Sequence, residues 1–239
     1  MTTLLVSDIH LRADAAATTE RFLAFLHDHA ARTEALYILG DLFEYWIGDD
    51  APLPGAERII EALREVVDCG VTVSVMHGNR DFLLGEAFSA RSGCRLLPDP
   101  SVVVLHGEPT LLTHGDLLCT ADRDHLAFRA MVDDHVWRTD FLSRPISERR
   151  SLAEQLRQYS RQGNREKEEE IMDVTPAAVA DAMRRHGVAQ LIHGHTHREG
   201  THQVSLASGE GRRIVLGDWH PERGSALLCD HSGCRFIPC

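Results

Sequence analysis

The sequence predicts an α/β fold in which a two-sheet β-sandwich core is flanked by helices and carries a helical cap insertion. Three observations lead to it. Strand-like and helix-like stretches alternate over 3–76, short strands between glycine-rich turns fill the end of the chain, and a polar segment without strands separates the two parts. Alternating strands and helices are typical of a sheet with helices packed on its faces. The 239 residues are enough for one domain, 1–239, that includes the insertion.

The first part of the chain supplies the elements of one sheet. Apolar runs at 3–7, 35–39 and 71–76 have the length and composition of buried strands. The stretches 18–31 and 57–67 between them carry apolar residues at helical spacing. This β-α-β-α-β order predicts a sheet covered by at least two helices.

Beyond Pro98 the predicted strands are short and lie between turns. They occupy 102–105, 109–113, 190–192, 202–206, 213–216 and 226–228. Such a run predicts a second, more antiparallel sheet that packs on the first. The pattern leaves the order of the strands open.

The segment from about 122 to 170 has a different character. It is polar, compatible with helix, and contains Pro145 as its only proline. Within 144–167 there are seven basic residues against three glutamates, although the whole chain has a net charge of −11. A solvated helical hairpin and a cap over a functional site both fit this composition.

Composition excludes several classes of protein. No apolar run approaches the roughly 20 residues that span a bilayer, and the N-terminus enters a strand without a signal-peptide pattern, so we expect a cytoplasmic location. The net charge of −11 is unfavourable for general nucleic-acid binding. The six cysteines form no CxxC pair, and without a secretory signal we expect them to be reduced thiols.

Residues that can bind metals follow the predicted strands. In an open α/β sheet the loops beyond the carboxyl ends of the strands converge on one crevice. In an extended chain, residues i and i+2 also point to the same side, so a motif with two donors at this spacing can direct both toward one site. The sequence stretches concerned are Asp8-Ile9-His10, Gly40-Asp41, Gly78-Asn79, His114-Gly115-Asp116 and Gly194-His195-Thr196-His197.

Together these stretches predict a dinuclear metal site. Each one alone has an ordinary alternative: Asp8 is also suited to capping a helix, and Gly-Asn to forming a turn. Nitrogen and oxygen donors without thiolate favour manganese, iron, zinc or cobalt. Seven donors exceed the needs of one tetrahedral ion and suit two divalent ions that share a bridging carboxylate.

The motif series DIH, GD, GNRD, HGD and GHTH resembles that of the calcineurin-like metallophosphoesterases along nearly the whole chain. The resemblance implies that family's fold and two metal sites with Asp41 as the bridge. One site comprises Asp8, His10, Asp41 and His197, and the other comprises Asp41, Asn79, His114 and His195. By the same likeness, Asp41, Asn79, Arg80 and His114 have catalytic roles.

Longer stretches are similar to the UDP-2,3-diacylglucosamine hydrolase family of lipid A biosynthesis. They are SDIHL at 7–11, GDLFEYWIGDD at 40–50, HGNRDF at 77–82 and IMDV at 171–174. The likeness implies hydrolysis of a lipid nucleotide-sugar to 2,3-diacylglucosamine 1-phosphate (lipid X) and UMP, with manganese as the metal. It also implies peripheral attachment to the cytoplasmic face of the inner membrane, without nucleic acid or an obligate protein partner.

Arg80 is the position that favours this narrower family. Many metallophosphoesterases have a histidine there, which can assist the leaving group. An arginine cannot act as an acid near neutral pH, but it offers a fork of donors for phosphate. UMP is itself a good leaving group, so a pyrophosphate substrate is compatible with Arg80.

The resemblance also implies which residues contact the substrate. The polar set is Asn79, Arg80, Asp122, Arg157, Ser160, Asn164, Lys167 and His195. His125 replaces an aromatic residue of some relatives, which puts stacking there in doubt. The residues expected to face the acyl chains, or else to pack in the core, are Trp46, Phe82, Phe128, Trp137, Phe141 and Leu142.

Two other classes of function remain as alternatives. A different metallophosphoesterase, such as a nuclease, a cyclic-nucleotide phosphodiesterase or a diadenosine-tetraphosphate hydrolase, shares the metals and differs in the cap. A non-enzymatic scaffold of the same fold is marked by degenerate ligands, and all seven predicted ligands are present here.

Overall fold

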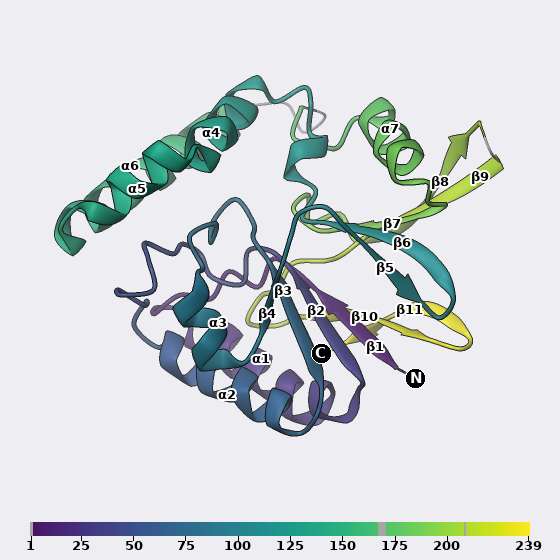
Figure 1. Cartoon of the computed structure of the whole chain (residues 1–239), viewed down its shortest axis with the longest axis horizontal. Coiled ribbons are helices and arrows are strands. Elements are labelled where there is room, and N and C mark those ends of the chain that lie inside the picture. The colour runs from purple at the N-terminus through teal and green to yellow at the C-terminus, as the bar shows by residue number, and fades with distance from the viewer. Residues whose placement is uncertain (1, 167–170, 208) are drawn as a thin grey trace.

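Two sheets packed face to face form the centre of the molecule (Figure 1). The computed structural model describes residues 2–166, 171–207 and 209–239, with the side chains of 159–166 left out of the description. The predicted α/β class with two sheets and flanking helices is confirmed. Within the described ranges, none of the helices combines the length and the apolar character that crossing a bilayer requires.

The first sheet has the strand order β11-β10-β1-β2-β3-β4. Its parallel centre is the predicted β-α-β-α-β unit, and helices α1 (Ala16–Asp28) and α2 (Ala56–Asp68) lie on its outer side (Figure 1). The strands are β1 (Thr3–Val6), β2 (Ala35–Leu39), β3 (Thr72–Met76), β4 (Arg95–Leu97), β10 (Ser225–Asp230) and β11 (Gly233–Pro238). The short helix α3 (Glu86–Ser92) precedes β4.

The second sheet has the order β5-β6-β7-β9-β8, and helix α7 (Pro176–His186) packs on its outer face. Its strands are β5 (Ser101–Leu105), β6 (Glu108–Thr113), β7 (Gln190–His193), β8 (Gly200–Leu206) and β9 (Gly209–Val215). Two strand pairs are antiparallel and two are parallel, so this sheet is mixed. Because β6 and β9 are both parallel to β7, the carboxyl ends of these three strands lie at the same edge of the sheet.

Alternation along β1 builds two apolar layers at once. Leu5 points between the sheets, where it packs with Ile192 and other residues of the second sheet. Leu4 and Val6 point the other way and pack with Phe22 and further residues from the helices. Because successive strand residues face opposite sides, a short apolar run supplies both layers.

The last strands differ from the prediction. The stretch 226–228 lies in β10 of the first sheet, antiparallel to β1, and not in the second sheet. The hairpin β10–β11 pairs Cys229 directly with Cys234, with 4.1 Å between their Cα atoms, and a disulfide joins them. The expectation of reduced thiols is therefore wrong for this pair, because strand register brings together two residues that are unremarkable in sequence. Cys69, Cys94, Cys119 and Cys239 are free thiols.

The segment that follows Asp122 forms three helices and not a hairpin. They are α4 (Arg123–Asp133), α5 (His135–Ser143) and α6 (Ile146–Glu166), and we call them the cap helices. Asp134 separates the first two, since its side chain accepts a hydrogen bond from the backbone of Trp137 and so starts α5. Pro145 precedes α6 and ends the preceding turn. Figure 1 shows the cap helices at one end of the molecule, away from the β10–β11 hairpin.

Charged contacts attach the cap helices to the core. On α6, the Arg149 guanidinium donates to the Ile47 carbonyl at 2.7 Å and to the Asp50 carboxylate at 2.8 Å. On α4, Arg129 Nε lies 2.8 Å from Asp116 Oδ2, and both side chains are buried. These contacts fix the first and the last cap helix to loops beyond the strand ends.

Candidate metal centre

The loops that leave β1 and β2 run side by side beyond the sheet. The backbone of Asp8 donates to Gly40 O at 3.1 Å, and that of His10 donates to Asp41 O at 2.9 Å. Leu11 then bonds Leu42 O at 2.9 Å. This short ladder continues the parallel pairing of the strands, so the first three predicted ligands meet at one edge.

The backbone at the predicted ligands is unusual. Among the described residues, six that are not glycine have a positive φ, and five of these are predicted ligands. They are Asp8 (φ 55°), His10 (φ 51°), Asp41 (φ 52°), His195 (φ 67°) and His197 (φ 58°). L-residues enter this left-handed region at a cost, and such strain concentrates at functional sites. The geometry independently singles out the residues that the sequence motifs suggest.

Two glycines of the motifs are required by close approach. A Cβ atom on Gly78 would collide with the Asp41 carboxylate, and one on Gly194 would collide with Ser7 and Asp8. Glycine at these positions lets the loops of different strands come together at the carboxylates.

The first group of donors contains Asp8, His10 and His197. Single donor atoms of the three lie within 4.8 Å of one another. His10 Nε2 and His197 Nε2 are 3.4 Å apart, and Asp8 Oδ1 lies 3.9 Å from the first and 3.4 Å from the second. Two imidazole nitrogens and a carboxylate oxygen therefore converge on one point.

The second group surrounds Asn79. Its Oδ1 atom lies 2.9 Å from His114 Nε2 and 3.0 Å from His195 Nδ1. Asp41 stands between the two groups, because its Oδ2 atom is 3.9 Å from His10 Nε2 and 3.8 Å from His114 Nε2. This position is the one that a bridging carboxylate needs.

The donors fit divalent cations. Asp8 Oδ2 accepts hydrogen bonds from the Ser7 hydroxyl and the backbone of His195, whereas Oδ1 is buried without a hydrogen-bond partner among the described residues. A buried carboxylate oxygen without a donor is stabilised by a cation. Since no thiolate is present and nitrogen is mixed with oxygen, the donor set is that of a first-row transition metal.

The protonation of the histidines gives the same indication. Burial opposes the charged form of His114, but the carboxylates of Asp41, Asp116 and Asp8 raise its pKa to about 9. Burial likewise opposes the charge on His197, while its contacts with Asp218 and Asp8 raise its pKa to about 10. In the metal-free protein protons thus neutralise the carboxylates, and metal ions would displace them.

The far nitrogens of the histidines have partners of their own. His114 Nδ1 lies 2.9 Å from Leu39 O, and His197 Nδ1 lies 3.2 Å from Asp218 Oδ2. His10 Nδ1 lies 3.4 Å from Glu44 Oε2. Such outer contacts set the tautomer and the direction of a metal-binding imidazole.

Two buried aspartates belong to the sequence motifs, although the sequence alone predicts no role for them. Asp81, in GNRD, accepts backbone hydrogen bonds from Gly78 and Leu42 at 2.8 Å each, and so ties the loop after β3 to the loop after β2. Asp116, in HGD, lies 2.9 Å from His125 Nε2 as well as binding Arg129. Their place inside the motifs was a signal for both. Glu44 also lies inside a motif, the stretch 40–50, but that stretch gave no sign of its contact with His10, and Asp218 lies outside all the motifs.

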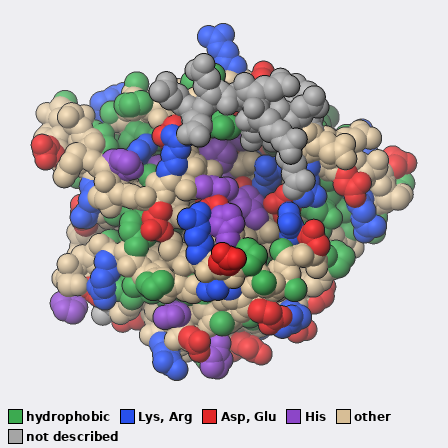
Figure 2. Space-filling model, turned by 180° about the vertical axis from the view of Figure 1, so that it is seen from behind, with side chains coloured by type: hydrophobic (Ala, Val, Ile, Leu, Met, Phe, Trp, Pro, Cys, Tyr) green, Lys and Arg blue, Asp and Glu red, His purple; other side chains and the backbone are tan. Residues whose placement is uncertain are grey.

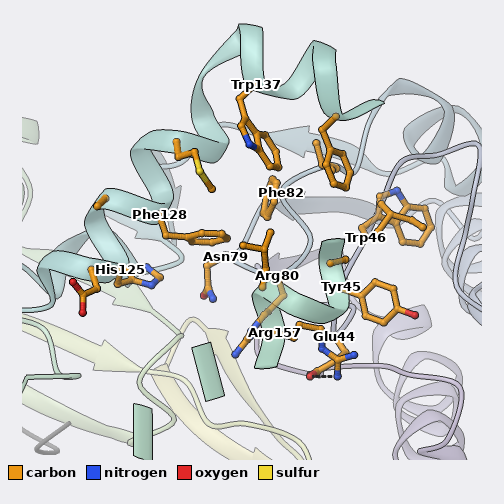
Figure 3. A pocket seen from close by; sticks show the side chains of 18 residues that line it. Glu44, Tyr45, Trp46, Asn79, Arg80, Phe82, His125, Phe128, Trp137 and Arg157 are labelled. Carbon is orange, nitrogen blue, oxygen red and sulfur yellow. Dashed lines mark hydrogen bonds and ion pairs between the residues drawn. The ribbon is translucent and has the colours of Figure 1, made fainter. Parts of the chain in front are cut away.

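A cavity of about 430 Å³ opens beside the second group of donors. Asn79, Arg80 and Arg157 line its polar end, together with Glu44 (Figure 3). His125 also lines it, from α4. The apolar part of the wall contains Trp46, Phe82, Phe128, Trp137 and Phe141. A mostly apolar cavity with a few polar groups at one end suits an amphipathic ligand.

The remaining predicted contact residues have other places. Asp122 is buried, and its side chain accepts a hydrogen bond from the backbone of His125 at the start of α4. Leu142 is 42% exposed on α5 and does not line the cavity. Lys167 and the side chains of Ser160 and Asn164 lie outside the described residues.

Histidine side chains gather near the middle of one face of the molecule, flanked by arginine and acidic residues (Figure 2). A two-sheet sandwich with converging imidazoles, carboxylates and an amide is the architecture of a metal-dependent phosphoesterase. The model of the calcineurin-like phosphoesterase family matches residues 1–199. The chain belongs to this family.

Within the family, the similar proteins carry one name. The UDP-2,3-diacylglucosamine hydrolase of Pseudomonas paraeruginosa is 49% identical over 238 residues, which cover 100% of this chain and 99% of the relative. Proteins of the same name from Chromohalobacter salexigens and Stenotrophomonas maltophilia are 49% and 47% identical, over 94% and 98% of this chain and 91% and 96% of their own lengths. The likeness over nearly full length includes the cap helices and places the chain among the UDP-2,3-diacylglucosamine hydrolases.

A solved structure shares the fold. An archaeal phosphodiesterase superposes with a TM-score of 0.50 at 13% sequence identity, and the match covers 100% of both chains. At this identity the likeness concerns the fold alone.

Proposed function

We propose that the chain hydrolyses the pyrophosphate bond of UDP-2,3-diacylglucosamine to 2,3-diacylglucosamine 1-phosphate and UMP, in lipid A biosynthesis. The observation that carries the proposal is the junction at Asn79, which belongs both to the donor cluster and to the wall of the apolar cavity. A ligand with a phosphate at one end and acyl chains at the other matches this junction. The name shared by the relatives agrees with such a substrate.

We expect two divalent ions, most naturally manganese, at the two groups of donors. Asp8, His10, Asp41 and His197 would hold one ion, and Asp41, Asn79, His114 and His195 would hold the other. When bound, such a pair of ions would supply Lewis-acid chemistry: polarisation of phosphoryl oxygens and a water of lowered pKa as the nucleophile.

The protein's own residues orient the substrate. Arg80 lines the cavity next to Asn79, and its always-charged guanidinium suits the pyrophosphate. Arg157 lines the same end from α6. We propose that Ser160, Asn164 and Lys167 complete these contacts further along the segment, and that Asp122 contributes by fixing the start of α4.

We further propose that the chain is one domain, 1–239, with the segment 122–170 as a cap insertion over the site. The apolar wall, with Trp137 and Phe141 from α5, would receive the acyl chains. A diacylated substrate resides in a bilayer, so we propose peripheral attachment to the cytoplasmic face of the inner membrane.

The direct test is UMP release from UDP-2,3-diacylglucosamine by the full chain, with Mn²⁺ added and with metal removed by a chelator. We expect release only with the metal, and little hydrolysis of nitrophenyl phosphate under the same conditions, because cavity contacts position the pyrophosphate. Equal specific activity on both substrates would instead support a generic phosphoesterase.

A further inference from the structure

Glu44 occupies a place between a predicted metal ligand and the cap helices. Its backbone donates to Leu11 O at 3.0 Å, which extends the ladder between the loops after β1 and β2. A parallel bridge between Leu11 and Phe43 precedes it. The side chain is therefore held next to His10, and the residue is only 8% exposed.

The two oxygens of Glu44 contact different parts of the molecule. Oε2 lies 3.4 Å from His10 Nδ1, and this nitrogen is buried. Oε1 accepts a hydrogen bond of 2.7 Å from the Arg157 guanidinium on α6. The same guanidinium lies over the Tyr45 ring, 5.0 Å from its centre. Figure 3 shows Arg157, Glu44 and Tyr45 together at the polar end of the cavity.

We infer that Glu44 is a positioning residue that couples the docking of α6 to the orientation of the His10 imidazole. A carboxylate on Nδ1 holds the proton there and turns the free Nε2 atom toward its target. His10 Nε2 faces Asp8 and Asp41, at 3.9 Å from each. Arg157 in turn fixes the carboxylate when α6 is docked.

This inference rests on the proposed function only in assuming that His10 binds a metal ion. Coupling between two sites is reciprocal, so an ion at His10 must stabilise the docked α6 as much as the docked α6 favours the ion. The effect is therefore measurable in the absence of substrate.

Asp218 provides a matched control. Its Oδ2 atom lies 3.2 Å from His197 Nδ1, an arrangement like that of Glu44 and His10. The further contacts that the structure gives it are with His220 at 2.8 Å and Arg223 at 3.0 Å, and neither residue belongs to the cap helices. Asp218→Asn thus disturbs an outer carboxylate without touching the cap.

The test is hydrogen exchange of the α6 amides in the full chain, with and without Mn²⁺ at saturating concentration. We expect Mn²⁺ to slow exchange in α6 of the wild type and of Asp218→Asn. In Glu44→Gln the slowing should be lost, and Mn²⁺ affinity should fall by about 10- to 100-fold in both variants. Equal slowing in Glu44→Gln and the wild type, or none in the wild type, would overturn the inference.

A second variant covers the case in which Glu44→Gln does not fold. Glu44→Asp keeps the charge but is one methylene too short to reach both partners, so it should lose most of the slowing in α6. Slowing equal to that of the wild type would count against the inference. Hydrolysis of UDP-2,3-diacylglucosamine by the wild type is a separate measurement: its absence would overturn the proposed function and leave the exchange result valid.

Discussion

The attachment of α6 by Arg149 can be tested with a single substitution. The residue is 2% exposed, and its guanidinium binds the Ile47 carbonyl at 2.7 Å and both oxygens of Asp50. Arg149→Met keeps the apolar stem and removes every donor. A buried carbonyl left without its donor costs about 1–3 kcal/mol. The Asp50 side chain is 61% exposed, so its ion pair contributes about 1 kcal/mol at most. We therefore expect the docking of α6 to weaken by about 1–4 kcal/mol.

Native-state hydrogen exchange measures this local loss. At 1.4 kcal/mol for each factor of ten, the α6 amides should exchange about 5- to 1000-fold faster in Arg149→Met. The amides of β1, β2 and β3 should not change, because Arg149 contacts Ile47 and Asp50 and not these strands. Arg149→Lys keeps the charge without the fork and should fall between the two. An α6 that exchanges as slowly as in the wild type would refute the reasoning.

Three further outcomes follow from the site. Asp41→Ala removes the shared carboxylate, so we expect kcat to fall at least about 100-fold while the fold persists, checked by circular dichroism; near-normal turnover would contradict a bridged pair of ions. Arg80→Ala should lower kcat/KM by about 10- to 150-fold with the metal content unchanged, and Arg80→Lys should restore part of it; full activity of Arg80→Ala would remove the pyrophosphate argument. Burial raises the pKa of Asp116, but its hydrogen bond with His125 and nearby positive charges lower the pKa by more, so that it lies below its ordinary value. Its stabilisation is therefore complete above about pH 4 and is lost as the pH falls, so urea unfolding of Asp116→Asn should lose less stability in acid than the wild type does.

The parallel half of the fold was predictable because its strands are buried on both faces. The run 35–39 coincides with β2, and 71–76 differs from β3 by one residue. A continuous apolar run between helical stretches has few other structures available to it. The hairpin β10–β11 was not predictable in the same way, because its membership of the first sheet depends on pairing with β1, more than two hundred residues earlier.

Helix α7 was not among the predicted elements, although the sequence carries local signals for it. Pro176 begins it and Gly187 ends it in a left-handed conformation, which is the usual punctuation of a helix. The number of cap helices depended on finer features, since Asp134 separates α4 from α5 within a uniformly polar stretch. The hydrogen bond by which Asp134 caps α5 does not interrupt the spacing of apolar residues, so the sequence pattern did not reveal the boundary between the two helices.

The predicted ligands converge because motif chemistry and strand ends agree on the same edge. Their outer partners could not be foreseen, because Glu44 and Asp218 reach the histidines through turns whose path the sequence pattern does not determine. The apolar cavity was foreseen only in part. Five of the six predicted residues line it. Leu142 follows the buried Phe141 in α5, and because neighbouring residues of a helix point in different directions, its side chain lies on an exposed face.

The left-handed backbone at five predicted ligands lowers the stability of the fold at the positions that metal binding requires. A residue with a side chain costs about 1 kcal/mol or more in this conformation relative to glycine, so the five together cost about 5 kcal/mol. That is comparable with the whole folding free energy of a small domain, about 5–15 kcal/mol. Glycine at Asp8 or His10 would relax the backbone and remove a ligand in the same step. Metal binding and backbone stability are therefore opposed at the same positions of this chain.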